Sequence, residues 1–258
     1  MADSPLADRP LIRIGVSSCL LGQRVRYDGG HKQDRLLTET LGRFFQWVPV
    51  CPEVELGLGT PREAIQLVQL GGDVRLRYSK TQEDLTLSMG KFVRSRVAEL
   101  AREDLGGYIL KKDSPSCGME RVKVHQQVGP AKRNGVGLFA AALLERFPHL
   151  PIEEEGRLGH PRLRENWIER VFAYDDLKRL FAGRWRLRDV VEFHARYKFS
   201  LLAHAEKEFR ELGRLVADAR SLPRVELRQR FESTFMAGLK KIATPKTNAN
   251  VPAGLRRV

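Results

Sequence analysis

The sequence predicts an α/β domain built on a parallel sheet, followed by an all-helical domain. Short apolar runs typical of strands alternate with helical patterns across residues 11–150, the order found in parallel α/β sheets. Beyond residue 161 the apolar periodicity is helical throughout. Residues 148–161 separate the two patterns, and their prolines, glycines and acidic triplet fit neither period. We therefore expect a linker there and two domains, residues 1–150 and 151–258.

The strands of the first domain are predicted from short apolar runs, and its helices from apolar residues spaced three or four apart. Pro49 falls inside the second predicted strand. Because proline cannot donate a backbone hydrogen bond, we expect that strand to be irregular or to lie at a sheet edge. The predicted strands are residues 11–16, 47–50 and 108–110, and the predicted helices are residues 36–45, 81–104 and 135–147.

The composition is that of a globular protein with an apolar core, because 42% of the 258 residues are hydrophobic and 30% are charged. The first ten residues, MADSPLADRP, lack the apolar segment of a secretory signal. The longest nearly apolar run, residues 136–144, is too short to span a bilayer. We therefore expect a cytoplasmic protein that does not enter a membrane.

The charge balance favours a polyanionic partner. The chain has 45 lysines and arginines against 32 aspartates and glutamates, a net charge of +13, and residues 151–258 carry the larger share of the excess. Such an excess attracts nucleic acids through charge and counterion release. Some soluble basic proteins have no such partner, but we expect nucleic-acid binding here.

Three cysteines are placed where a parallel sheet assembles ligand sites. Cys19, Cys51 and Cys117 each follow an apolar, strand-like run in the first domain, and the carboxyl ends of parallel strands share one edge. An odd number of cysteines does not suggest a disulfide framework. Inert buried thiols are the alternative, although such cysteines usually lie within strands or helices. The positions favour a shared metal or cluster site.

Thiolates bind zinc, copper(I) or iron–sulfur clusters. Structural zinc sites usually have four ligands in local pairs such as C-x₂-C, and no such pair occurs in the sequence. Three distant thiolates suit a cubane cluster with one iron that has no protein ligand. That iron would be an open Lewis acid, to which a substrate sulfur is well matched.

The segments around the three cysteines resemble the thiouracil desulfidase family. The matching segments read VSSCLLGQRVRYDGGHK, PVCPEVELGLGTPR and LKKDSPSCGMERVKV. The resemblance extends over residues 11–145, which are most of the first domain. The resemblance implies a [4Fe-4S] cluster on Cys19, Cys51 and Cys117. It also implies that the open iron takes sulfur from a thiolated pyrimidine, releasing uracil and sulfide without net redox change.

Two further residues match positions with roles in that family. Glu53 resembles the carboxylate that activates water for attack on the sulfur-bearing carbon; the alternative is a carboxylate in a salt bridge. Ser114 resembles an active-site hydroxyl beside the substrate; the alternative is a turn residue that caps backbone amides. Lys111 and Lys112 are candidate phosphate contacts or a solvated strand end.

The second domain is predicted to contain helices over residues 162–181, 188–220 and 223–242. On the long second helix, one sector opposite the apolar stripe contains basic residues and no acid, which favours contact with phosphates. His194 and Lys198 lie on the apolar side, so we expect either an acid beside the lysine or a polar cleft. The predicted RNA-binding residues are His194, Arg196, Lys198, Lys207, Arg210 and Arg214.

The segments FHARYKFSLLAHAEKEFRELGRLVAD and EEEGRLGHPRLRENWIERVF resemble the YbgA-type helical domain. Joined to a desulfidase domain, the pair resembles bacterial desulfidases that remove 4-thiouridine from tRNA, which implies that the helical domain binds RNA. The chain departs from that pattern in its last residues, PAGLRRV, which are shorter than the expected helical continuation. Two alternatives remain: a desulfidase of free thiouracil or thiouridine nucleotides, and a noncatalytic, redox-sensing nucleic-acid-binding protein.

Overall fold

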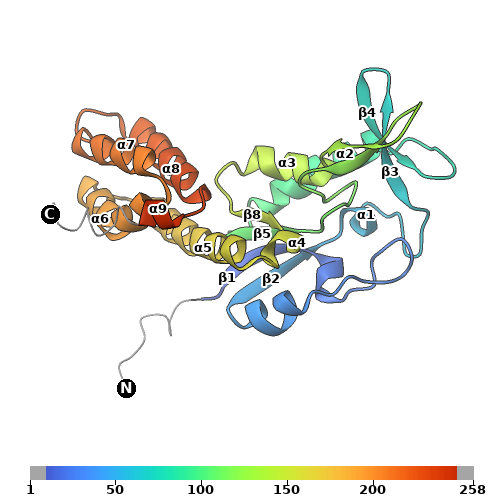
Figure 1. Cartoon of the computed structure of the whole chain (residues 1–258), viewed down its shortest axis with the longest axis horizontal. Helices are drawn as coiled ribbons and strands as arrows, with labels where there is room; N and C mark the ends of the chain where they lie inside the picture. Colours follow the sequence, from blue (N-terminus) through green and yellow to red (C-terminus); the bar gives the residue numbers. More distant parts are fainter. Residues whose placement is uncertain (1–9, 249–258) are drawn as a thin grey trace. The chain divides into compact units, whose positions relative to one another are not determined.

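The computed structural model describes residues 10–248 and comprises two compact units that divide between Leu158 and Gly159 (Figure 1). The first is a parallel-sheet α/β unit and the second is all helical, as predicted. The predicted departure in the final residues, PAGLRRV, lies outside the described part of the chain.

The main sheet of the first unit is parallel, with the strand order β2-β1-β5-β8. Strand β2 lies at its edge, which confirms the expectation raised by Pro49. The central strands β1 and β5 are largely buried, and for that reason their sequences are nearly continuous apolar runs. The strands are β1 (Ile12–Ser17), β2 (Phe45–Val50), β5 (Gly107–Leu110) and β8 (Ile152–Glu154).

The sheet packs against two helices, α2 (Thr86–Leu100) and α3 (Leu138–Arg146), which contact each other. Tyr108 is fully buried, and its ring lies across β1 at Gly15. A Cβ atom at Gly15 would lie 2.1 Å from Cδ2 of Tyr108, so only glycine allows this close approach. The Tyr108 ring also packs against Phe139 of α3, with the ring centroids 5.8 Å apart.

A second sheet, also four-stranded, with the strand order β4-β3-β6-β7 was not predicted. Strands β3 and β4 form an antiparallel hairpin across Gly71, whose φ of +58° suits glycine. Figure 1 shows this hairpin projecting beyond the main sheet. The strands are β3 (Ile65–Leu70), β4 (Asp73–Tyr78), β6 (Val122–His125) and β7 (Lys132–Gly135).

Three predicted elements of the first unit differ from the structure. Residues 36–45 form a π-helical turn (Leu36–Thr40) and a 3₁₀ turn (Leu41–Arg43) rather than one α-helix. The predicted helix 81–104 is confined to α2, because residues before Thr86 form a turn that bonds to β4. The predicted helix 135–147 begins only at Leu138, since Gly135 ends strand β7.

The predicted linker 148–161 is wrong. It contains strand β8, which pairs with β5, and the short helix α4 (Glu155–Leu158). Two members of the acidic triplet are buried with partners: Glu153 accepts from Arg157 at 2.7 Å, and Glu154 accepts from the Met119 N–H at 2.7 Å. These bonds offset the cost of removing carboxylates from water, and the first unit extends to Leu158.

The second unit is a helical bundle whose core is built from aromatic rings. Phe193 makes edge-to-face contacts with Phe231 and Phe235, with centroid separations of 5.8 and 5.1 Å. None of the described helices has the length and apolar character needed to cross a membrane. The helices are α5 (Pro161–Phe181), α6 (Leu187–His204), α7 (Glu206–Ala217), α8 (Arg224–Lys240) and α9 (Pro245–Asn248).

The predicted long helix 188–220 is two helices, α6 and α7, separated at Ala205. Ala205 is extended, with φ −156° and ψ 93°. The preceding residue, His204, is buried, and its ring bonds to Glu169 at 2.8 Å and to the Lys241 carbonyl at 2.5 Å. These contacts hold the end of α6 in place and direct the chain into α7.

Candidate active site

Three neighbouring strands bring the cysteines to one edge of the main sheet. Cys19 lies in the 3₁₀ turn that follows β1, Cys51 is the N-cap residue of helix α1 (Pro52–Glu55) after β2, and Cys117 lies in the loop after β5. Because β2, β1 and β5 are adjacent and parallel, their carboxyl ends meet. The predicted meeting of the three cysteines is therefore present in the fold.

All three cysteines line one cavity of about 380 Å³. Their exposed fractions are only 8%, 9% and 4% for Cys19, Cys51 and Cys117. Glu53 and Ser114 line the same cavity, so the five residues predicted for the cluster and the chemistry lie together. The basic side chains that share the lining are Arg26, Lys32, Arg62, Lys111 and Lys112.

Burial makes the three thiols hard to ionise. It raises the pKa of Cys19 to about 11 and, with the negative charge of Glu53, that of Cys51 to about 12. Burial raises the pKa of Cys117 well above its usual range, and Glu53 and the other two thiols add to the effect. Three thiolates in this cavity therefore require a compensating positive charge, such as that of bound metal.

The donor set fits an iron–sulfur cluster. All three cysteines are free thiols, the ligands that iron–sulfur clusters favour. Within residues 10–248, no three Cys, His, Asp or Glu side chains are grouped closely enough to hold a single metal ion. A cubane presents a separate iron to each thiolate and so takes ligands spaced more widely than a zinc ion does.

Glu53 is held inside the cavity by neutral partners. Its Oε1 accepts a 2.7 Å hydrogen bond from Ser116 Oγ, and its Oε2 lies 3.4 Å from the Cys51 thiol, which donates to it. The Glu53 side chain is buried, and the described residues include no salt bridge to it. The alternative considered from the sequence, a carboxylate in a salt bridge, therefore does not describe Glu53 within residues 10–248.

Ser114 caps the loop that carries Cys117. Its Oγ accepts hydrogen bonds from the backbone N–H groups of Ser116 at 3.2 Å and Cys117 at 3.1 Å. This is the capping role considered as the alternative, and the residue also lines the cavity. A role toward substrate is compatible with both observations.

Sequence reasoning missed Ser116 and Glu155. Ser116 is fully buried and bonds to Glu53, but the sequence SPSC does not tell which serine faces the carboxylate. Glu155 forms an ion pair with Lys111 at 2.5 Å and also accepts from the Lys112 N–H at 2.8 Å. Glu155 belonged to the supposed linker, so its proximity to the cavity was not foreseen.

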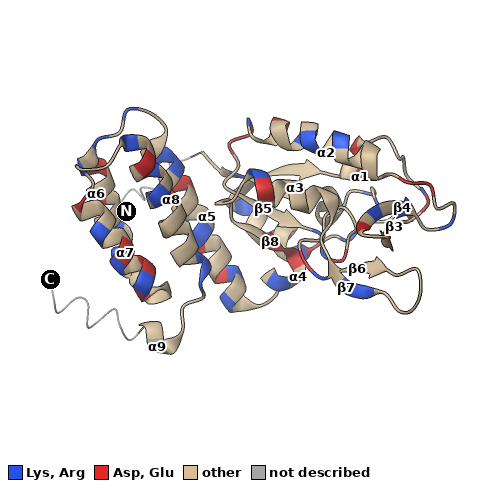
Figure 2. Cartoon of the chain, turned by 90° about the horizontal axis from the view of Figure 1, so that it is seen from above, with Lys and Arg blue, Asp and Glu red and all other residues tan. Residues whose placement is uncertain are grey.

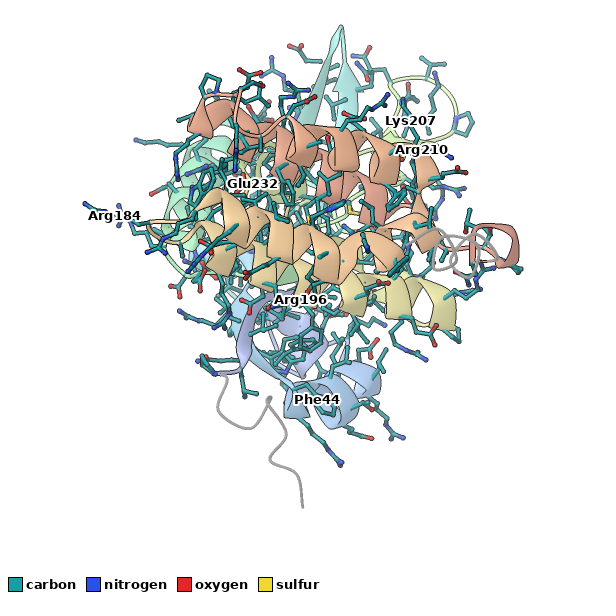
Figure 3. The ribbon with its side chains drawn as sticks, turned by 90° about the vertical axis from the view of Figure 1, so that its left-hand side faces the viewer. Phe44, Arg184, Arg196, Lys207, Arg210 and Glu232 are labelled. Atoms are coloured by element: carbon teal, nitrogen blue, oxygen red, sulfur yellow. The ribbon has the colours of Figure 1, made fainter. Side chains whose placement is uncertain are left out.

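The basic sector predicted for the helical unit does not form one acid-free surface. Arg196 on α6 forms an ion pair with Asp176, with Nη1 3.6 Å from Oδ2. Arg210 on α7 forms one with Glu206, with Nη2 2.7 Å from Oε1. Lys207 and Arg214 are also on α7. Figure 3 shows Arg196 well apart from Lys207 and Arg210. The prediction assumed one continuous helix, and the break at Ala205 removes the common face.

His194 and Lys198 form a basic pair on α6. Burial lowers the pKa of His194, and the neighbouring charge of Lys198 lowers it further. His194 Nε2 is buried without a hydrogen-bond partner, while Lys198 Nζ lies 4.9 Å from the Phe199 ring centroid. No described carboxylate pairs with Lys198 in a salt bridge, so the acid partner considered from the sequence is not found within residues 10–248.

Comparison with known proteins gives two family matches. The 2-thiouracil desulfurase family model matches residues 14–155, and the model of a protein family of unknown function, DUF1722, matches residues 198–254. YbbK of Bacillus subtilis (strain 168), an uncharacterised protein, is 32% identical over 133 residues, which cover 50% of this chain and 87% of YbbK.

Two further proteins are similar to parts of the chain. YbgA of Escherichia coli (strain K12), also uncharacterised, is 29% identical over 91 residues, 35% of this chain and 54% of YbgA, so the match spans about half of that protein. The solved structure of the [4Fe-4S]-dependent thiouracil desulfidase TudS is 31% identical, with a TM-score of 0.47, covering 57% of this chain and 93% of TudS. Because its family model covers more than half of the sequence, including all three cysteines, the chain belongs to the 2-thiouracil desulfurase family.

Proposed function

We propose that this protein is an iron–sulfur-dependent desulfidase that removes sulfur from 4-thiouridine in tRNA, giving uridine and sulfide. The observation that carries the proposal is the meeting of three buried thiols and one buried carboxylate, Glu53, in a single cavity. Family membership supplies the chemical class, a thiolated pyrimidine. Three free cysteines suit a reducing compartment, which favours the cytoplasm.

Cys19, Cys51 and Cys117 would hold a [4Fe-4S] cluster as thiolates. When bound, the cluster supplies an iron without a protein ligand, a Lewis acid suited to the sulfur of the substrate. Lys111, fixed by Glu155, contributes positive charge beside Cys19 and lowers the pKa of that thiol against the effect of burial. The chain thus provides both the ligands and part of the charge that stabilises them.

Glu53 would act as the general base toward water. The reaction is a hydrolysis: water oxygen replaces sulfur on the pyrimidine carbon, and sulfur leaves as sulfide, so no external oxidant or reductant is needed. The Ser116 hydroxyl holds Oε1 of Glu53, while Oε2 receives its hydrogen bond from the Cys51 thiol. Ionisation of Cys51 removes that donor and leaves Oε2 free to accept a proton from water.

Ser114 would orient the pyrimidine ring of the substrate. Two backbone N–H groups donate to its oxygen, so both lone pairs are engaged. The hydroxyl proton is therefore left to donate into the cavity, where the remaining carbonyl oxygen of a thiouracil ring is a suitable acceptor. The same two bonds fix the position of the oxygen, which reduces the entropy lost when substrate binds.

An RNA substrate is favoured by charge around the cavity and across the chain. Lys32 and Lys112 line the cavity, are exposed, and have no carboxylate partner within the described residues. They are placed to meet phosphates next to the modified nucleoside. These lysines suit the single phosphate of a free thiouridine nucleotide equally well, which makes the nucleotide the second candidate substrate.

The test compares turnover of the anaerobically prepared holoenzyme on tRNA containing 4-thiouridine, on 4-thiouridine monophosphate and on free thiouracil. We expect the highest kcat/KM for tRNA, with kcat/KM falling as salt increases because phosphate contacts are screened. Higher kcat/KM for the monophosphate than for tRNA would instead assign the enzyme to free nucleotides. Failure to release sulfide from all three would contradict desulfidase activity.

A further inference from the structure

We propose that one end of the helical bundle is a phosphate-binding surface for RNA, distinct from the basic sector considered from the sequence. The proposal rests on an RNA substrate and identifies where the helical unit would contact it. The surface, here called the arginine end, consists of Arg184, Trp185, Arg186, Arg220 and Arg224.

Chain topology gathers these residues. Helices α5, α6, α7 and α8 are joined by short connections, and α6 contacts α7 as α7 contacts α8. The end of α5, the start of α6, the end of α7 and the start of α8 therefore lie at the same end of the bundle. A direct contact confirms this: Arg224 Nη1, at the start of α8, donates to the Trp185 carbonyl in the α5–α6 loop at 2.5 Å.

Arg224 is held ready for a ligand. Its guanidinium carbon lies 4.7 Å from the centroid of the Trp185 ring, and the Nη1 bond fixes the direction of the group. A guanidinium has five N–H donors, and those not used by the Trp185 carbonyl remain for an oxyanion. An arginine already ordered by an aromatic ring loses less entropy when it binds a phosphate than a free one does.

The arginine end carries charge that the protein does not neutralise. Arg184, Arg186, Arg220 and Arg224 are exposed and form no salt bridge with any of the described carboxylates. Three exposed arginines along the helices, Arg210, Arg228 and Arg230, each pair with a glutamate four residues away on the same helix. Arg214 of α7 is also exposed and has no salt bridge among the described residues, but it stands alone rather than in a group. Figure 2 shows this mixture of basic and acidic positions along α7.

A shallow hollow lies beside the arginines. It has a volume of about 440 Å³ and is lined in part by Arg184 and Trp185. Asp189 also lines it, but that carboxylate lies 3.4 Å from Arg188 and accepts from the Arg186 backbone N–H at 2.7 Å. The one acid in the lining is therefore already neutralised, and the hollow is open to an anionic ligand.

Four exposed arginines at one end of the bundle, one of them held against the Trp185 ring, suit the phosphates of RNA. Arginine binds phosphate through paired N–H donors, and an adjacent aromatic ring and hollow accommodate an unstacked base. Figure 3 shows Arg184 projecting from one end of the helical unit, while Lys207 and Arg210 lie toward the other. The two basic regions are far enough apart to be tested separately.

The test uses two full-length holoenzyme variants that each lose three positive charges: R184Q/R186Q/R220Q at the arginine end, and R196Q/K207Q/R210Q as the matched control. Binding of tRNA is measured over a series of salt concentrations. We expect the arginine-end variant to lower the slope of log K against log salt by about two, at roughly 0.7–0.9 for each lost phosphate contact, and to lose about 10-fold or more in affinity near 0.1 M salt. The control should change the slope by less than one.

Both variants should turn over 4-thiouridine monophosphate at the rate of the unmodified protein, because neither alters the cavity. Equal losses of tRNA affinity in the two variants would overturn the inference, since net charge alone would then explain binding. A larger loss in the control would place the RNA on α6 and α7 and overturn it as well. If the unmodified protein removes sulfur from the monophosphate but does not bind tRNA, both the arginine end as an RNA-binding surface and tRNA as the substrate are wrong. If it removes sulfur from none of the substrates, the proposed desulfidase activity is wrong.

Discussion

Ser116 Oγ donates a 2.7 Å hydrogen bond to Glu53 Oε1 within the wall of the cysteine-lined cavity. Ser116 is fully buried and follows β5 in the chain, whereas Glu53 is the second residue of helix α1, which follows β2. The bond therefore joins two loops that each supply a cysteine to the cavity. It fixes the carboxylate relative to Cys51 and Cys117, and it occupies Oε1 of Glu53 with a hydrogen bond from a buried hydroxyl.

Replacement of Glu53 by glutamine should preserve the cluster and abolish most turnover. Glutamine keeps the shape and the hydrogen bond from Ser116 but cannot accept a proton from water, so kcat should fall by roughly 10²–10⁴-fold. Anaerobic turnover is measured after iron content shows the variant to be loaded. Near-normal kcat in a loaded variant would remove Glu53 from the mechanism.

The Ser116→Ala variant tests positioning rather than proton transfer. Without the hydroxyl, Glu53 keeps its basicity toward water but loses the bond that orients it, so we expect kcat to fall by about 10–100-fold with little change in KM. Ser116→Thr, which retains a hydroxyl, is the matched control and should recover part of the loss. Equal kcat for the alanine variant and the unmodified protein would show that the bond has only a structural role.

His204 should make the helical unit more stable at low pH than at high pH. Burial by itself lowers the pKa of this imidazole, but its bonds to Glu169 and to the Lys241 carbonyl outweigh burial and raise it. A raised folded-state pKa stabilises the fold fully below the unfolded value, near 6.5, and this contribution disappears as pH rises through the folded value.

The measurement is the free energy of unfolding between about pH 5.5 and 8.5 for the protein and for His204→Gln. Their difference should shrink as pH rises, by on the order of 1 kcal/mol for one unit of pKa shift. Comparison of the two proteins cancels the contribution of His194, whose pKa is shifted in the opposite direction. If the difference in unfolding free energy is independent of pH, the His204 imidazole is not protonated and held by two hydrogen bonds as described.

The boundary between the units gives a further prediction. A fragment of residues 1–158 retains β8 and the Lys111–Glu155 ion pair, whereas a fragment of residues 1–150 loses both. We expect the longer fragment to bind iron and desulfurate 4-thiouridine monophosphate, and the shorter one to have a lower melting temperature and to bind less iron. Equal melting temperatures and iron contents would show that β8 adds nothing to the first unit.

Three of the four strands of the main sheet and the meeting of the cysteines were predictable because local sequence determines them. Continuous apolar runs mark β1 and β5, and each cysteine follows a strand of one parallel sheet. Strands β6 and β7 were missed because they are four residues long and rich in exposed polar side chains. In β6 buried valines alternate with exposed polar residues, but four residues are too few to distinguish a strand from a loop, and β7 has no apolar alternation.

The remaining errors have tertiary causes. The acidic stretch at residues 153–155 resembles a linker, and its burial depends on Met119, Arg157 and Lys111, two of which are distant in the sequence. The break at Ala205 is marked by neither glycine nor proline, and it accompanies the contacts of His204 with α5 and with the end of α8. Such partners are not visible in the local pattern.

The metal content of the three-cysteine cavity tests the proposed cluster most directly. Iron and acid-labile sulfide are measured after anaerobic reconstitution of the full-length protein and of Cys51→Ser. We expect about four irons and four sulfides per chain for the unmodified protein, the stoichiometry of a cubane, and loss of most of both in the variant. Stoichiometric zinc in protein purified without oxygen, with no uptake of iron, would contradict the proposed cluster.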